Sequence, residues 1–380
     1  MSLEIPPEIQ QQVAEEERVQ HAEWLYSTEV EELAGLVNVT FPNLNVPIEL
    51  KYDKFYEGTR YTAEADLEVY YRRSGRERPL FTGRLALRGP QKKKQAADYC
   101  SERASSFDRW GEVVENGCEA ALRRFREGAP FKDIRTVERR KELEYVVWPV
   151  IPRKNPTVIF GTGGLGKSLL GGCYMGVRAA LGPEYNATID DGLLVHKQYR
   201  VGYLDWEADE DEVRDRWASI ADGLQVPEPF LAYERVHGSL AGQIHAIRNK
   251  VLKDDIDFLV IDSALPASGG QAESAEAVGL FYDALGALDL SSIIIAHQAK
   301  AQIGFTSNTP FGSTFWWNEA RSVWHIAAEQ DEQPGVLEVG LFHKKANSGR
   351  KHEDLGFRIE FHDAIPGIEQ YGYVKVQKLN

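Results

Sequence analysis

The most informative stretch of this chain is GTGGLGKS, residues 161–168. It is a Gly-rich turn that ends in Lys-Ser, the pattern of a phosphate-binding loop. The run TVIFG before it is apolar and β-branched, as a buried strand is, and LLGGCYMGVRAAL after it is a good helix sequence. Because the pattern carries weight only between a strand and a helix, these flanks favour a phosphate site over an incidental Gly-rich turn.

Each position of the loop has a predicted role. The glycines let backbone N–H groups turn toward a shared anion, Lys167 reaches the terminal phosphates, and the Ser168 hydroxyl is offered to Mg²⁺. We therefore expect ATP and Mg²⁺ as cofactors. The residues expected at the nucleotide are Gly161, Thr162, Gly163, Gly164, Leu165, Gly166, Lys167, Ser168 and Leu169.

Composition narrows the class of protein. At 380 residues the chain is long enough for a principal domain and a smaller companion. Its N-terminus is acidic and no apolar run approaches the roughly 20 residues of a membrane span, which predicts a cytoplasmic protein with no membrane partner. The net charge of −14 argues against indiscriminate binding to nucleic acid, but a local basic site stays compatible with it. The three cysteines lack metal-ligand spacing and are expected to be free thiols.

The chain is predicted to have three parts. Residues 1–45 are polar and charged with a helical pattern, and we expect a leader helix and a linker. Residues 46–140 combine alternating apolar and polar runs with apolar residues at helical spacing between Ala96 and Phe125. This predicts a small α+β domain with an antiparallel sheet and one long helix. Residues 141–380 form the third part.

The third part has the pattern of an α/β fold. The runs TVIFG, VGYLDWE, DFLVIDS and SSIIIAHQ are continuously apolar, which is typical of strands covered on both faces of a mainly parallel sheet. Helical segments separate them, so we predict a sheet flanked by helices, with ligands at the carboxyl ends of the strands. The C-terminal runs alternate and predict hairpins.

Three polar side chains follow these strands. Glu207 comes off the strand VGYLD, where a carboxylate could orient the attacking water; the alternative is a helix-capping role, which we assign to residues 209–212. Asp262 ends the strand FLVI and is expected to bind Mg²⁺ together with Ser168. His297 ends the next strand, beside Gln298 and Lys300, and is either a catalytic residue that senses the γ-phosphate or a core histidine.

These elements resemble the RecA-like ATPases, and within them the branch of the hexameric plasmid helicase RepA and the DnaB-type replicative helicases. The resemblance covers residues 145–365 through GTGGLGKS, LDWE, VIDS, AHQAK, FGSTFWWNEARSVW and HKKANSG. It implies a homo-oligomer, expected to be a hexameric ring that binds single-stranded DNA. Arg321 is then expected to reach into the ATP of a neighbouring subunit, with Lys345 near the same interface. The DnaB-type finger, Lys-x-Arg-Asn-Gly, is not met by Lys-Ala-Asn-Ser-Gly, so RepA is the closer match.

Two regions are candidates for DNA contact. In RecA-like rings the loops corresponding to residues 264–277 and 301–313 line the channel; here they are small and polar with few basic residues. The other candidate is residues 71–95, where nine basic residues accompany one acid and Tyr71 and Phe81 offer stacking surfaces. A solvated sheet face is the alternative explanation of that charge.

The sequence therefore predicts an ATP-hydrolysing RepA- or DnaB-like helicase of phage or plasmid replication. Two alternatives stay open. One is a RecA-like recombination or repair ATPase that binds DNA without unwinding it, and the other is a P-loop nucleotide switch that gates a protein partner.

Overall fold

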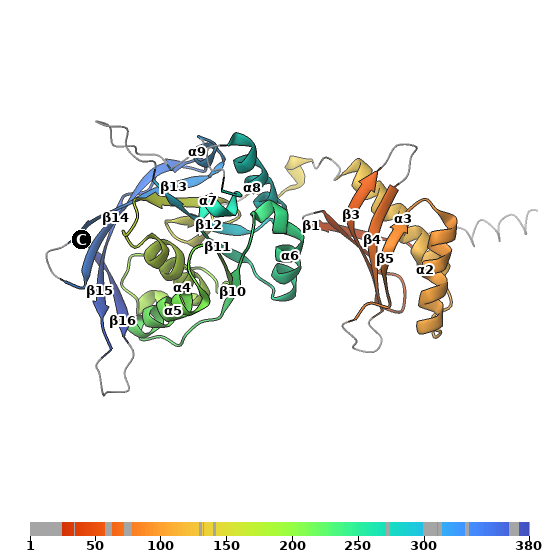
Figure 1. The fold of residues 1–380 in the computed structure, drawn as a ribbon, viewed down its shortest axis with the longest axis horizontal. Helices are drawn as coiled ribbons and strands as arrows, with labels where there is room; N and C mark the ends of the chain where they lie inside the picture. Colours follow the sequence, from red (N-terminus) through yellow and green to blue (C-terminus); the bar gives the residue numbers. More distant parts are fainter. Residues whose placement is uncertain are drawn as a thin grey trace, which may run out of the picture. The chain divides into compact units, whose positions relative to one another are not determined.

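The computed structural model describes residues 25–33, 35–57, 63–71, 78–128, 131, 133–139, 142–270, 274–298, 310, 314–330, 334–364 and 372–379. The chain divides into two units, Met1–Glu138 and Arg139–Asn380, which are described separately (Figure 1). Within the described residues, no helix has the length and apolar character needed to cross a membrane.

The N-terminal unit is an antiparallel sheet with two helices on one face (Figure 1). Its strands follow sequence order: β1 (Glu29–Leu33), β2 (Leu36–Thr40), β3 (Ile48–Glu57), β4 (Ala63–Tyr71) and β5 (Phe81–Ala86). Alternate residues of β3 and β4 are buried, so one sheet face forms the core under α2 (Pro90–Arg103) and α3 (Trp110–Glu127). β1 and β2 precede residue 46, where we expected a leader helix and linker; residues 1–24 of that segment lie outside the described residues.

The single long helix predicted for this unit is two helices. The chain leaves helical geometry at Ala104, which has φ −136° and ψ 61°. The carbonyl of Ala104 accepts a 3.3 Å hydrogen bond from the indole of buried Trp110, and the Phe107 ring packs edge-on against the same indole. Packing of Trp110 and Phe107 thus stabilises the turn between the two helices. The sequence pattern does not reveal the turn, because the apolar residues on both sides have the spacing of one continuous helix.

The second unit has a large mixed sheet, which confirms the predicted α/β class. Among the described residues it has nine strands, six parallel and three antiparallel. In spatial order they are β10 (Leu231–Arg235), β9 (Val201–Asp205), β11 (Phe258–Asp262), β12 (Ser291–His297), β8 (Pro156–Gly161), β13 (Ser322–Gln330), β14 (Val336–Ala346), β15 (Leu355–His362) and β16 (Tyr373–Leu379). The parallel part places the carboxyl ends of β8, β9, β11 and β12 at one edge.

Helices cover both faces of the parallel strands (Figure 1). The π-helix η3 (Lys167–Tyr174), its continuation α4 (Met175–Ala180) and α5 (Glu210–Leu224) contact one another on one face, and α6 (Leu240–Lys253) contacts α8 (Ala275–Ala287) on the other. The direction of each crossover accounts for this division, because right-handed connections in opposite directions emerge on opposite faces. The remaining short elements are β6 (Tyr145–Val147), β7 (Ile151–Pro152), α7 (Ala264–Ala267), α9 (Phe315–Glu319), η2 (Ile134–Thr136) and η4 (Pro183–Ala187).

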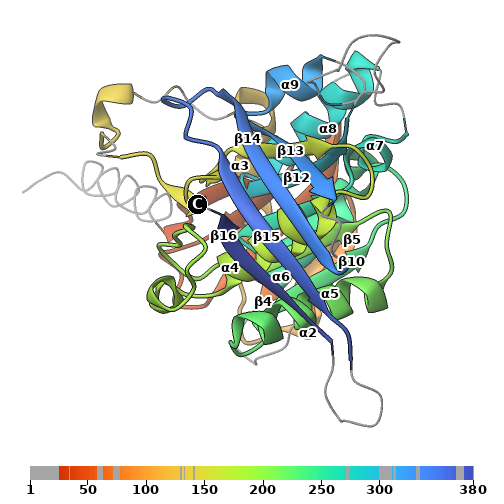
Figure 2. The same ribbon diagram turned by 90° about the vertical axis from the view of Figure 1, so that its left-hand side faces the viewer.

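Two close contacts hold the first face together. The fully buried Arg178 of α4 donates a 2.7 Å hydrogen bond to Asp191, which also accepts one from Tyr174 of η3. At Gly223 of α5 a Cβ atom would lie 1.9 Å from the carbonyl oxygen of Val374, so only Gly lets α5 approach β16 this closely. The C-terminal strands β14, β15 and β16, seen from their outer side in Figure 2, are thereby fixed beside the helices that follow β8 and β9.

Candidate nucleotide-binding and catalytic site

The phosphate-binding loop leaves β8 at Gly161 and turns back into η3. Gly164 and Gly166 have φ angles of 78° and 71°, in the left-handed region that favours glycine. A Cβ atom on Gly166 would also lie 3.3 Å from the side chain of Leu337, at the start of β14. The glycines of the motif therefore permit both the turn of the backbone and its packing against the C-terminal strands.

Lys167 lies folded into the loop that precedes it. The side chain is buried, and its Nζ donates a 2.6 Å hydrogen bond to the carbonyl oxygen of Thr162. Burial lowers the pKa of Lys167, while the carboxylates of Asp262 and Glu207 act in the opposite direction. The ammonium group is thus held where it can exchange a carbonyl for a phosphate oxygen.

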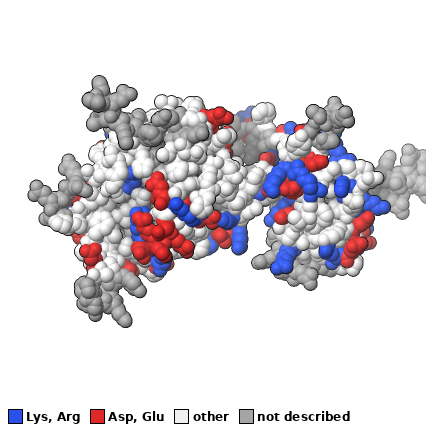
Figure 3. Space-filling view, viewed as in Figure 1, with Lys and Arg blue, Asp and Glu red and all other residues white. Residues whose placement is uncertain are grey.

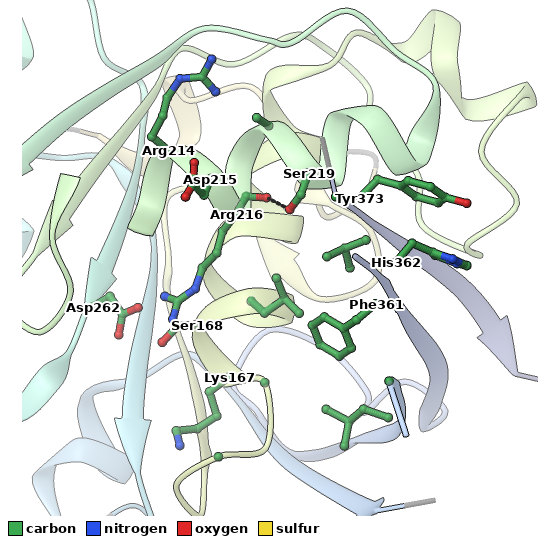
Figure 4. A pocket seen from close by; sticks show the side chains of 18 of the residues that line it. Lys167, Ser168, Arg214, Asp215, Arg216, Ser219, Asp262, Phe361, His362 and Tyr373 are labelled. Atoms are coloured by element: carbon green, nitrogen blue, oxygen red, sulfur yellow. Dashed lines mark hydrogen bonds between the residues drawn. The ribbon is translucent and has the colours of Figure 1, made fainter. Parts of the chain in front are cut away.

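Asp262 ends β11 next to the loop, and it is almost completely buried. Its Oδ2 accepts a 2.7 Å hydrogen bond from the hydroxyl of Tyr203 on β9, whereas Oδ1 is buried and has no hydrogen-bond partner among the described residues. Burial raises the pKa of this carboxyl, and the Tyr203 and Ser168 hydroxyls oppose that effect. Figure 4 shows the Ser168 and Asp262 side chains facing the same space.

This arrangement fits a magnesium ion beside a nucleotide. Mg²⁺ is usually held by one or two protein oxygens, with waters and phosphates completing its shell, so a large cluster of ligands is not required. Accordingly, the described residues contain no group of three or more His, Cys, Asp or Glu that could hold a metal by itself. The unpartnered Oδ1 of Asp262 and the Ser168 hydroxyl would supply the two oxygens.

Glu207 occupies a turn that is fixed by the backbone. Oδ1 of the fully buried Asp205 accepts hydrogen bonds of 2.9 and 3.0 Å from the backbone N–H groups of Glu207 and Ala208. The N–H of Trp206 donates a 2.7 Å hydrogen bond to the carbonyl of Asp262, which joins the turn to β11. The predicted acids at the start of α5 are capping residues as expected, since the Asp209 side chain accepts from the N–H of Glu212.

The Glu207 carboxylate contacts two side chains from neighbouring strand ends. Its Oε1 accepts a hydrogen bond from the Ser263 hydroxyl and lies 3.4 Å from Nε2 of His297. The Glu207 and His297 side chains are 44% and 42% exposed, so both remain accessible to water. The structure therefore places Lys167, Asp262, Glu207 and His297 at one edge of the sheet, as a catalytic site for phosphate hydrolysis requires.

A cleft of about 1330 Å³ extends from this edge. Its walls are the phosphate-binding loop with η3, the side of α5, and the ends of β14, β15 and β16 (Figure 4). The third wall carries Phe361 together with His362 and Tyr373, whose rings stack with centroids 4.3 Å apart. The cleft is thus larger than a phosphate chain needs, and in Figure 4 the His362 and Tyr373 side chains lie across it from Lys167.

A family model described as an AAA domain matches residues 122–302. The match includes the phosphate-binding loop, Glu207, Asp262 and His297, and it ends before Arg321 and Lys345. The match is consistent with the loop geometry and the sheet topology. These findings support a RecA-like P-loop ATPase.

Two further comparisons were made. No curated protein matches the chain. Among solved structures, a KaiC-like protein of the hyperthermophilic archaeon Pyrococcus horikoshii OT3 matches 62% of this chain and 94% of its own, with 13% identity and a TM-score of 0.40.

The two residues predicted at a subunit interface lie outside the cleft of the ATPase unit. The three protons of Lys345 are directed at the carbonyls of Trp317, Asn318 and Ala320, at 2.6, 2.9 and 2.8 Å, so this side chain caps the carboxyl end of α9. Arg321 comes after Ala320, the C-cap residue of α9. Its backbone pairs with Pro156 and Asn347, and its exposed side chain forms no ion pair within the described part of the chain. Both roles stay predictions.

The predicted DNA-contacting regions are only partly described. Lys300 and residues 301–309 and 311–313 lie outside the described residues, and the loop after β11 begins with the short helix α7. In the basic stretch, Arg84 pairs with Glu64 and Asp66 on the open face of β4, and Lys93 is nearly buried against Glu115. Two of the nine basic residues are therefore neutralised, and three more, Arg72, Arg73 and Arg76, are outside the described residues. Figure 3 shows the Lys and Arg side chains of this unit interspersed with acidic ones.

Several residues of the site escape sequence patterns. Asp205 is an acidic residue at the end of a strand, which by itself does not indicate a role. Ser263 belongs to no motif that predicts its contact with Glu207. Arg216 lines the cleft from within a run of charged residues on α5, where a solvated helix face is the ordinary explanation. Arg216 follows Glu212 at i, i+4 spacing. This spacing is the one sequence signal that predicts the two side chains on the same face of α5.

Proposed function

We propose that this protein is a magnesium-dependent ATPase that works as a homo-oligomeric helicase on single-stranded DNA, in the replication of a phage or plasmid. The observation that carries the hydrolytic part is the position of Glu207. Its carboxylate stands at the carboxyl edge of the sheet, near the buried Asp262 and Lys167, and is oriented by Ser263 and His297.

The chemistry follows from these positions. Glu207 is exposed enough to hold a water molecule and to accept its proton as the water attacks the γ-phosphate. Lys167 neutralises charge on the phosphate oxygens, and the backbone N–H groups of the loop bind the phosphate chain. Mg²⁺ held by Ser168 and Asp262 would supply electrostatic stabilisation of the developing charge. His297, in contact with Glu207, is placed to hold that carboxylate toward the water.

The oligomeric part of the proposal is supported by Arg321. Its side chain is exposed and forms no ion pair within the described part of the chain, as expected for a group that completes the site of a neighbouring subunit. A trans arginine can contribute about 10³- to 10⁵-fold to turnover, so assembly would control hydrolysis. The choice of DNA as the partner is supported by the resemblance to RepA and by the basic residues of the N-terminal unit.

Steady-state turnover tests the proposal. We expect ATP hydrolysis that requires Mg²⁺ and rises with single-stranded DNA, together with displacement of a strand from a forked duplex. Lys167→Ala should abolish nucleotide binding or turnover, and Glu207→Gln should keep binding but lose hydrolysis. Wild-type-like turnover in Glu207→Gln would remove that residue from the mechanism.

The alternatives give different results. DNA-stimulated turnover without strand displacement would favour a recombination or repair ATPase, and slow turnover that ignores DNA would favour a nucleotide switch. Negative-stain images with an ATP analogue, with and without single-stranded DNA, separate a ring from a filament or a monomer. A protein that stays monomeric under all these conditions would contradict the oligomeric part.

A further inference from the structure

Two arginines of α5 line the cleft, and their surroundings differ. Arg214 is 57% exposed and forms a 2.9 Å ion pair with Glu228 near the outer rim. Arg216 is 29% exposed, and its side chain runs back along α5 toward the phosphate-binding loop. In Figure 4 its guanidinium points to the side of the cleft where Ser168 and Asp262 lie, with Lys167 beyond, and α5 contacts η3, the helix that carries Ser168. Arg216 is therefore at the phosphate end of the cleft, and Arg214 is not.

The charge of Arg216 reaches into η3. Burial raises the pKa of the Cys173 thiol to about 12, and the largest influence in the opposite direction is the charge of Arg216. Cys173 belongs to η3, the helix that begins with Lys167 and contacts α5. The guanidinium thus acts on the same helix whose N-terminal end is directed at the phosphates.

The present partner of Arg216 is easily exchanged. Its guanidinium pairs with Glu212, one turn earlier on α5, and the Glu212 carboxylate is 49% exposed. An i, i+4 pair of this kind, exposed to water, stabilises a helix only weakly. A guanidinium binds phosphate more strongly, because two parallel charged hydrogen bonds match its planar fork. Exchange of Glu212 for a phosphate group is therefore favourable once a nucleotide occupies the cleft.

We propose that Arg216 binds the β- or γ-phosphate of the nucleotide within its own subunit, releasing Glu212 as it does so. This inference rests on the proposed ATPase function and adds a second cation of the same chain to the phosphate site. Arg216 and Arg321 then have different tasks. Arg216 binds the phosphates whether or not subunits assemble, whereas Arg321 would act only across an interface.

Nucleotide binding to the full-length protein with Mg²⁺ tests this, with ATP, ADP and AMP measured separately by calorimetry. Arg216→Ala should weaken ATP binding by about 10- to 100-fold and AMP binding by less than about 3-fold, since AMP lacks the two outer phosphates. Arg216→Lys should fall between wild type and Arg216→Ala, because an ammonium keeps the charge and loses the fork. Arg214→Ala, the matched control on the same helix, should bind ATP like the wild type.

A second variant should act in the opposite direction. Glu212→Gln frees Arg216 from its carboxylate partner and should tighten ATP binding by about 2-fold while leaving AMP binding unchanged. Melting temperatures of all variants show whether each one is folded. The inference is overturned if folded Arg216→Ala binds ATP as tightly as Arg214→Ala, or if ATP and AMP lose the same factor. Wild-type protein that binds no ATP would overturn the proposed function as well, so the two failures are distinguishable.

Discussion

Oδ1 of Asp205 accepts a 2.9 Å hydrogen bond from the backbone N–H of Glu207. The same carboxylate accepts a 2.9 Å hydrogen bond from the Tyr233 hydroxyl and lies 3.5 Å from the guanidinium of Arg235. A buried acid two residues before the proposed catalytic carboxylate thus fixes the turn on which that carboxylate stands. Asp205 itself is fully buried and does not line the cleft, so it acts through the position of Glu207.

Replacing Asp205 tests this indirect role. We expect Asp205→Ala to lower kcat for ATP by about 10- to 100-fold with little change in KM, because Glu207 loses its orientation while the phosphate site stays intact. The free energy of unfolding, measured in urea, should fall by about 1–3 kcal/mol, since the Tyr233 hydroxyl loses its hydrogen-bond acceptor. Asp209→Ala is the control: it removes the cap of α5 without touching Glu207, and should cost about 1 kcal/mol of stability while keeping kcat. Equal kcat in both variants would contradict the role of Asp205.

Mixing two inactive variants tests the trans role of Arg321. Subunits with Arg321→Ala keep an intact loop, and subunits with Lys167→Ala keep an intact arginine. If the arginine acts across an interface, mixed assemblies contain some sites with both groups, and part of the turnover should return. Turnover as a function of the mixing ratio is the measurement. A mixture as inactive as its components would mean that Arg321 acts within its own subunit or is structural.

Lys345 should matter for stability before it matters for chemistry. Lys345→Met removes the donor to three carbonyls of α9 and of the residue after it, which leaves partly buried acceptors unpaired. We expect the free energy of unfolding, measured in urea, to fall by about 1–3 kcal/mol, and we expect ATP binding to stay unchanged. Lys344→Met is the matched neighbour; its ammonium lies 5.2 Å from the centroid of the Phe342 ring, and we expect less than half of that loss. Lost turnover at full stability would instead favour the predicted interface role of Lys345.

Acid should destabilise the second unit through His343. Its ring stacks on Trp324 at 4.1 Å, and Nδ1 accepts a 2.8 Å hydrogen bond from the N–H of His352. Burial, assisted by the charges of His352 and Lys351, lowers the pKa of His343 to about 4, against the opposing effects of Lys345 and Asp354. Between pH 6.5 and 4 the unfolded chain binds a proton that the folded chain does not. The free energy of unfolding therefore falls as pH falls through this window, by an amount on the order of 2–3 kcal/mol.

The variant His343→Asn isolates that contribution, because an amide oxygen can still accept the His352 N–H but does not titrate. Urea unfolding at intervals from pH 7 to pH 4.5 should show a flatter profile for the variant than for the wild type. Parallel profiles would mean that His343 does not contribute to the acid sensitivity.

Local pattern was enough to predict much of the fold. The loop motif needs only consecutive residues, because glycine conformations and the Lys-Ser ending are properties of a short segment. Continuous apolar strands then predict a parallel sheet, and such a sheet brings Lys167, Glu207, Asp262 and His297 to one edge whatever its exact strand order. The break between α2 and α3 was missed because it depends on the packing of Trp110 in the core of the unit.

The amino-acid sequence is enough to predict a phosphate-binding loop between a strand and a helix of an α/β sheet, since periodicity and glycine placement act over a few residues. The side chains that surround the loop are set by tertiary contacts. Asp205 accepts a hydrogen bond from the backbone of Glu207, and Lys345 donates to the carbonyls at the end of α9. The Arg216 side chain extends from α5 toward the phosphate-binding loop. Several of these contacts join residues that are distant in the sequence. Arg214 and Arg216 are alike as parts of a sequence pattern, and only the packing of α5 against η3 and β16 distinguishes them.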